Sequence, residues 1–304
     1  MKKIIVLVVA AAIAVMACKT PPENPNVAPE IKAEIPELFS PDPDVKNDKM
    51  SIAITINHPV PIKDWTIEIQ PARRQTGQAT QRQGAQAGQR QDGEQRQRPE
   101  GEQGQRRRRS AFFEQSGKKD PPKTWQWDGK GTSGEMVQSA TDYTFNLSVN
   151  DIFDNHGTYE GTISVDVLVR REGDVLRIIV PSIVFPPNSA DFRLLDEEDM
   201  RSNRRVLGLI ARALNRFADY AITVEGHANP TTPPDTPERA AEEIADKPLS
   251  EQRAGAVVDS LVANNDIERQ RLSVAGMGST RPVADYDDDD ENWKNRRVEF
   301  ILKK

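Results

Sequence analysis

The residues whose types and spacing suggest chemistry lie in two short stretches, 222–230 and 249–254. The first is typical of a strand that ends in a turn containing Gly226. The second is typical of a helix start, with Ser250 at the N-cap and Arg253 in the first turn. A strand end beside a helix N-terminus presents backbone N–H groups, a partial positive charge and a guanidinium, which together suit a carboxylate. Nothing in either stretch is arranged to break a bond.

The elements that position these residues are expected within the C-terminal segment 174–304. Apolar residues recur at helical spacing over 196–218 and again over 251–263, and short apolar runs between and around them predict strands. A Pro-rich excursion over 229–248 is expected to hold a short helix around 237–245. The order β-α-β-α-β-β predicts an α+β sheet with its helices on one face.

The preceding segment, 37–170, has a different apolar period. Its apolar residues alternate with polar ones in several short runs separated by turn signals, which predicts an all-β antiparallel sandwich. An insertion at 73–110 interrupts it, with ten arginines, eleven glutamines and only four acidic residues. Because the insertion lacks aromatic and large aliphatic residues, we expect a disordered loop. It is either a simple solvated loop or one whose Arg106 to Arg109 run holds an anionic polymer or lipid headgroup.

The N-terminus is typical of an exported, lipid-anchored protein. A basic start and a short apolar run over 1–17 resemble a signal peptide, and the run is short for a membrane span of ~20 residues. The small residue before Cys18 resembles a bacterial lipobox, so Cys18 is the expected lipidation site, and Lys19 after it favours outer-membrane sorting. The alternative is an ordinary secretory signal with an incidental cysteine. Residues 18–36 are rich in proline and are expected to form a semi-rigid tether.

Composition excludes several other classes of function. The formal net charge of −6 argues against a nucleic-acid binder, and a single cysteine excludes a disulfide framework or a multi-cysteine metal site. The three histidines are scattered and no hydrolase motif occurs, so neither an enzyme nor a cofactor is expected. Weak calcium candidates are Asp42, Asp44 and Asp48, for which an exposed acidic turn is the expected structure. The acidic run 285–291 is expected to be a solvated loop.

The sandwich segment carries a moderate resemblance to a known domain type. The residues that carry it are Phe39-Ser-Pro-Asp-Pro-Asp44, Trp127-Asp-Gly129, Gly134-Glu135, Tyr143 and Asn150-Asp151. They resemble the immunoglobulin-like domain found in the flagellar hook-capping protein and in many cell-surface modules. The resemblance implies a spacer or an interaction module and supplies no chemistry.

The C-terminal segment carries a more specific resemblance. Its motifs are Gly226-His227, Leu249-Ser250-x-x-Arg253-Ala254, Gly276-x-Gly278 with Pro282-Val283, and Asn295-Arg-Arg-Val-Glu299. Together they resemble the OmpA-like peptidoglycan-binding domain. That resemblance implies noncovalent binding of the peptidoglycan stem peptide at its diamino acid, with an Asp holding the ammonium group and an Arg the carboxylate.

This sequence departs from the family pattern at one of these two positions. The Arg maps onto Arg253, but the Asp position is occupied by Asn229, which lacks the charge that strengthens a bond to an ammonium group. We therefore expect weaker binding, a different diamino acid, or compensation by a neighbour such as Asp235. His227 is expected to orient the turn more than to contact ligand. The full set of predicted peptidoglycan-binding residues is Asn229, Arg253, His227, Asn295, Arg296 and Arg297.

These features predict an outer-membrane lipoprotein, facing the periplasm, that ties the membrane to peptidoglycan. Acyl chains at Cys18 form one attachment and the region around Arg253 the other, with the sandwich as a spacer between them. The alternative is an envelope adaptor whose sandwich and basic loop bind a partner protein or an anionic glycan.

Overall fold

The computed structural model describes residues 22–41, 48–72 and 111–304. No helix in these ranges is both long enough and apolar enough to cross a membrane. Several predictions concern residues outside this described part, namely the signal peptide 1–17, Cys18, Asp42, Asp44 and the insertion 73–110.

Two antiparallel sheets form the N-terminal region and share one apolar core. One sheet has the order β1 (Glu30–Glu34), β2 (Met50–Asn57), β5 (Thr124–Trp127). The other has the order β4 (Phe113–Lys118), β3 (Ile62–Pro71), β6 (Asp142–Asp151), β7 (His156–Ser164). The apolar residues of β6 alternate strictly with partly exposed ones, so one side of that strand faces the core. We refer to these seven strands as the two-sheet region.

The N-terminal tether is shorter in the structure than the sequence predicts. β1 lies inside the predicted tether 18–36 and pairs with β2 over its whole length. Ile31, Ala33 and Ile35 are partly buried against the core, and this short alternating pattern lies between Pro29 and Pro36. The density of prolines in this segment therefore masked a strand that the prolines flank but do not interrupt.

The C-terminal region is one five-stranded sheet with two long helices. The sheet has the order β11 (Leu272–Gly278), β10 (Ala221–His227), β12 (Val298–Lys303), β9 (Val175–Val180), β8 (Arg170–Glu172). The helices are α2 (Glu197–Asn215) and α3 (Pro237–Asn265), with short 3₁₀ turns η2 (Phe192–Leu194), η3 (Arg269–Arg271) and η4 (Asn292–Asn295). The order from β9 to β12 agrees with the predicted one. β8 adds an edge strand, so this sheet begins at 170 rather than at 174.

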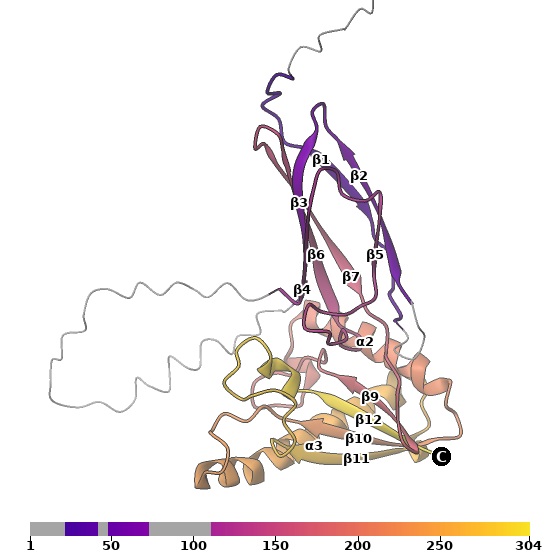
Figure 1. Ribbon diagram of the computed structural model, residues 1–304. Coiled ribbons are helices and arrows are strands. Elements are labelled where there is room, and N and C mark those ends of the chain that lie inside the picture. The colour runs from indigo at the N-terminus through magenta and orange to yellow at the C-terminus, as the bar shows by residue number, and fades with distance from the viewer. Residues whose placement is uncertain (1–21, 42–47, 73–110) are drawn as a thin grey trace, which may run out of the picture.

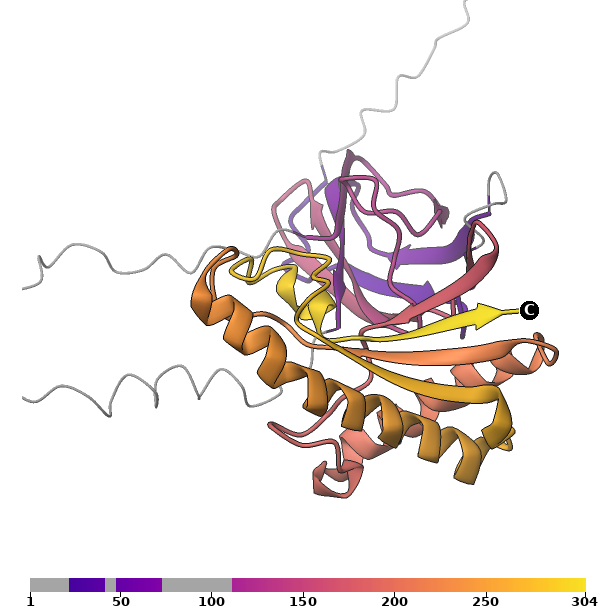
Figure 2. The same ribbon diagram turned by 90° about the horizontal axis from the view of Figure 1, so that it is seen from below.

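Both helices pack on one face of this sheet. In Figure 1 the two-sheet region stands over the sheet, and Figure 2 shows α2 and α3 together on the side away from it. The apolar core between helices and sheet includes Val224 and Phe300 from the strands, Ile210 from α2 and Val257 from α3, all fully buried. Asp196 caps α2 by accepting a hydrogen bond from the Asp199 N–H.

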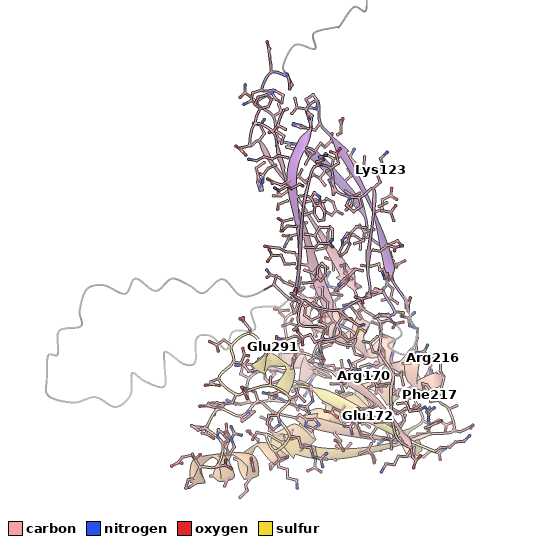
Figure 3. The ribbon with its side chains drawn as sticks, viewed as in Figure 1. Lys123, Arg170, Glu172, Arg216, Phe217 and Glu291 are labelled. Atoms are coloured by element: carbon pink, nitrogen blue, oxygen red, sulfur yellow. The ribbon has the colours of Figure 1, made fainter. Side chains whose placement is uncertain are left out.

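Polar contacts join the two regions. The Ser182 hydroxyl donates to the Ala140 carbonyl over 2.8 Å, and Arg205 of α2 pairs with Asp142 of β6 over 2.7 Å. Lys294 pairs with Glu135 over 2.7 Å and also with Glu291. Figure 3 shows Glu291 on the loop at this junction. The acidic run 285–291 is thus linked to the two-sheet region through the lysine that follows it.

Glycines let α3 approach the sheet at backbone distance. A Cβ built on Gly226 would lie 2.0 Å from the Ser250 carbonyl oxygen, and one on Gly276 would lie 2.4 Å from that of Lys247. Gly278 has a φ of +55° and a similar close contact with α3. Side chains at these positions would push the helix away from the ends of β10 and β11.

We expect Gly226→Ala to destabilise the protein by about 3 kcal/mol, because neither backbone in this contact can yield without repacking the core. The matched control is Gly208→Ala in α2, where a Cβ meets nothing within 4 Å. It should stabilise by up to ~1 kcal/mol, as alanine does in helices. Chemical denaturation of both variants measures the difference. Equal stability of the two variants would contradict the close approach of α3.

Candidate functional site

The candidate site lies where four loops and α3 meet at one end of the C-terminal sheet. β10 runs parallel to β11 and antiparallel to β12, which is antiparallel to β9, so three strands end and one begins there. The Ala228 N–H donates to the Gly278 carbonyl over 2.8 Å, and the His227 N–H donates to the Arg297 carbonyl over 2.9 Å. These bonds hold the turns that carry the predicted residues side by side.

The helix start predicted at Ser250 is wrong. α3 is one continuous helix that begins at Pro237, where the Thr236 side chain accepts from the Arg239 N–H, and it passes through Pro248. Ser250 is buried within it, so the site contains no helix N-terminus and no partial positive charge from one.

Close packing explains why the helix does not break at Pro248. Proline removes one amide donor from a helix and usually ends or kinks it. Here the Ser250 hydroxyl donates to the Lys247 carbonyl and accepts from the Gly278 N–H, each over 2.8 Å. Tertiary contact with the strand ends therefore keeps both turns around Pro248 in place.

Arg253 is fixed by the loop that follows β9. Its Nε donates to the Ser189 carbonyl and its terminal nitrogen to the Pro186 carbonyl, each over 3.1 Å. The guanidinium also lies 5.2 Å from the centre of the Phe185 ring. These contacts use two of the five guanidinium donors and set its plane, while other donors stay available.

A second guanidinium lies beside it. The charge of Arg296 acts on Arg253, and the Arg296 side chain makes no hydrogen bond or ion pair within the described part of the chain. Burial lowers the pKa of Arg296, and burial followed by the Arg296 charge lowers the pKa of Arg253. Two partly desolvated cations in one place favour an anionic ligand.

Asn229 joins this group through Asn295. The Asn295 side chain is fully buried and its amide nitrogen donates to the Asn229 side-chain oxygen over 2.9 Å. The structure therefore brings together four of the six predicted residues, namely Asn229, Arg253, Asn295 and Arg296.

His227 and Arg297 lie on a different side. Val224 and Phe300 face the helices, so the residues next to them, Glu225 and Glu299, point to the opposite face of the sheet. Arg297 is buried there and its Nε donates to Glu299 over 2.6 Å. This places Arg297 in an ion pair within the fold, apart from Arg253.

His227 is buried in the same network. It is 4% exposed, and its Nε2 lies 3.6 Å from carboxylate oxygens of both Glu225 and Glu299. Neither ring nitrogen has a hydrogen-bond partner among the described residues. Burial, followed by the charge of Arg297, lowers its pKa to about 4.

The same three side chains have the donor types of a metal site. The ligand atoms of Glu225, His227 and Glu299 lie within 4.8 Å of one another. However, Arg177 pairs with one oxygen of Glu299 and Arg297 with the other, and Arg281 lies 3.5 Å from Glu225. A bound cation would face all these guanidinium groups, so we interpret the cluster as an ion-pair network. Of the weak calcium candidates only Asp48 is described, and it is partly buried.

The sequence reasoning missed Asp246. It lies on α3 near Arg253, whose pKa its charge raises, and near the Ser279 side chain. Burial raises the pKa of Asp246 itself. A prediction of one continuous helix would have placed Asp246 on the same face as Arg253, since the two residues are seven apart. Asp235, proposed as a compensating residue, lies in the exposed turn before α3.

Known proteins resemble this region. Residues 184–296 match the model of the OmpA family. The peptidoglycan-associated lipoprotein of Brucella melitensis is 32% identical over 127 residues, which cover 38% of this chain and 70% of that protein. The peptidoglycan-binding protein ArfA of Mycobacterium tuberculosis is 31% identical over 97 residues, and the chain spans only 27% of its length.

A solved structure of a putative MotB-like protein from Desulfovibrio vulgaris is 24% identical, with a TM-score of 0.36, over 45% of this chain and 78% of that one.

The buried histidine predicts a pH dependence of stability. The unfolded chain takes up a proton at His227 near pH 6.5, whereas the folded chain does so only near pH 4. Stability is therefore lost as the pH falls from about 6.5 to 4, by about 3 kcal/mol from this residue. His227→Gln should flatten the fall in melting temperature over that range, whereas the exposed His156→Gln should keep it. An unchanged slope in His227→Gln would contradict the assignment.

Proposed function

Because the chain belongs to the OmpA family, we propose that its C-terminal region binds peptidoglycan noncovalently and that the chain tethers the outer membrane to the cell wall. The observation that carries the proposal is the pair Arg253 and Arg296 at the strand ends. The first is oriented by backbone carbonyls, and the second is partly buried without an ion-pair partner in the described structure.

The ligand is the stem peptide, held through a carboxylate at this pair. A guanidinium forms short, charge-assisted bonds with a carboxylate, and partial burial of both cations strengthens them. Removing the two cations from water has a cost that a bound anion offsets. The polar groups of the site hold and orient a charged peptide, and we assign them no bond-breaking step.

The second attachment is the lipid that we propose at Cys18. The apolar run before it, the small residue at 17 and Lys19 after it support export, lipidation and sorting to the outer membrane. The relative from Brucella melitensis is itself named a lipoprotein. Two attachments on one chain allow each to be weak, because tethering raises the effective concentration for the other.

The two-sheet region is the spacer in this proposal. Its two antiparallel sheets around one core support an immunoglobulin-like domain, and its polar contacts with α2 and the loop before β12 hold it against the binding region. The tether that precedes it then comprises about residues 18–29, of which Asn24 and Pro29 contact the two-sheet region.

We expect Arg253→Ala to lower the affinity of the full chain for purified sacculi at least tenfold, because it removes charge-assisted bonds to the ligand. Sedimentation of the protein with sacculi measures this. Arg212→Ala, at an exposed position on α2, is the matched control and should bind as the parent does. Parent-like binding by Arg253→Ala would show that the site is elsewhere.

Cys18→Ala should move the protein from the membrane fraction to the soluble fraction, because the only proposed anchor is lost. Its affinity for sacculi in solution should stay that of the parent, since the two attachments are separate. Cell fractionation with metabolic lipid labelling checks both points. Retention of the variant in the outer membrane would contradict lipid anchoring at Cys18.

A further inference from the structure

The proposed function leaves open how a ligand with an ammonium group is held when residue 229 is an amide. Given peptidoglycan binding at this site, as proposed above, the orientation of one buried amide and the continuity of α3 identify the residue that recognises the ammonium group.

The orientation of Asn295 is fixed by backbone groups. Its side-chain oxygen accepts from the N–H groups of Val283 and Ala284 over 2.7 and 3.0 Å. Its amide nitrogen donates to the Ala284 carbonyl over 2.8 Å. Exchanging its oxygen and nitrogen would set donors against donors and an acceptor against an acceptor, so this assignment follows from the network.

The orientation of Asn229 follows in turn. The Asn295 amide nitrogen is a donor, so the atom of Asn229 that it meets over 2.9 Å must be the oxygen. The other end of the Asn229 side chain is therefore its amide nitrogen, which has no hydrogen bond among the described residues. Position 229 thus presents its amide nitrogen, a donor that suits a carboxylate or carbonyl, while its oxygen is turned toward Asn295.

An acceptor for the ammonium group exists on α3. Asp246 and Arg253 are seven residues apart, which places them on one helix face about 10 Å apart along the axis. Asp246 is partly buried, forms no ion pair with another described residue, and has the Ser279 hydroxyl beside its carboxylate. Apart from Asp246, that buried hydroxyl has no partner in the described structure.

Two other acidic residues close in sequence, Glu242 and Asp235, are less suited to bind the ammonium group. Glu242 accepts from the backbone and hydroxyl groups of Thr231 and Thr232, which occupies both of its oxygens. Asp235 lies in the exposed turn before the helix. Among the described acids, Asp246 is the one whose charge acts on Arg253.

We propose that Asp246 binds the ammonium group of the ligand's diamino acid, while Arg253 and the amide nitrogen of Asn229 donate to its carboxylate. The negative charge of the site thus lies on α3, and the turn after β10 contributes a neutral donor. A zwitterionic ligand group that lies between the helix turns of Asp246 and Arg253 pairs with both of these charged side chains.

The test compares two synthetic stem tripeptides, one with a free side-chain amine on the diamino acid and one with that amine acetylated. Isothermal titration calorimetry with the full chain in detergent measures both affinities. The parent should bind the free-amine peptide about tenfold more tightly, as one charge-assisted bond is lost on acetylation. Asp246→Asn should bind the free-amine peptide as weakly as the acetylated one. Asp259→Asn, exposed on the same helix, should keep the tenfold difference.

A tenfold preference retained by Asp246→Asn, or equal binding of both peptides by the parent, overturns the role of Asp246 and leaves peptidoglycan binding intact. Failure of the parent to bind either peptide or sacculi overturns the proposed function and this inference with it. Thermal melts that match the parent show that Asp246→Asn is folded.

Discussion

The close packing of α3 against the ends of β10 and β11 is the constraint on which the candidate site depends. Gly226 and Gly276 allow backbone contact that any side chain would prevent, and Ser250 bonds the helix to Gly278. This contact carries α3 through Pro248 and sets Asp246 and Arg253 at the level of the strand ends. Without it, these two side chains would belong to separate segments with no fixed relation.

The side chains of the segment that leads into β12 lie in two different surroundings. Asn295 and Arg296 lie on the loop side. The Asn295 amide fixes the Asn229 side chain, and Arg296 adds a partly buried charge. Arg297 and Glu299 pair on the sheet face away from the helices and surround His227. A short run of polar residues thus provides both a partly buried charge at the candidate site and an ion pair on the other face of the sheet.

The sequence predicted most of the strands and α2 well, because apolar periodicity is a local signal. It failed where tertiary contact overrides local preference. The Pro-rich stretch 229–248 was expected to hold only a short helix separate from the next one, which hid the shared face of Asp246 and Arg253, and the prolines near β1 suggested a tether in place of a strand. The burial of His227 and Arg297 also needed the structure, since alternation across a bulge after Gly226 cannot be followed from sequence alone.

The placement of the ligand is tested most directly by a crystal structure of the full chain with a bound stem tripeptide whose diamino acid carries a free amine and a free carboxylate. We expect the carboxylate within hydrogen-bond distance of Arg253 and of the Asn229 amide nitrogen, with the ammonium group at Asp246. A peptide bound away from the ends of β10 and β11, or one whose ammonium group contacts Asn229, would contradict this placement.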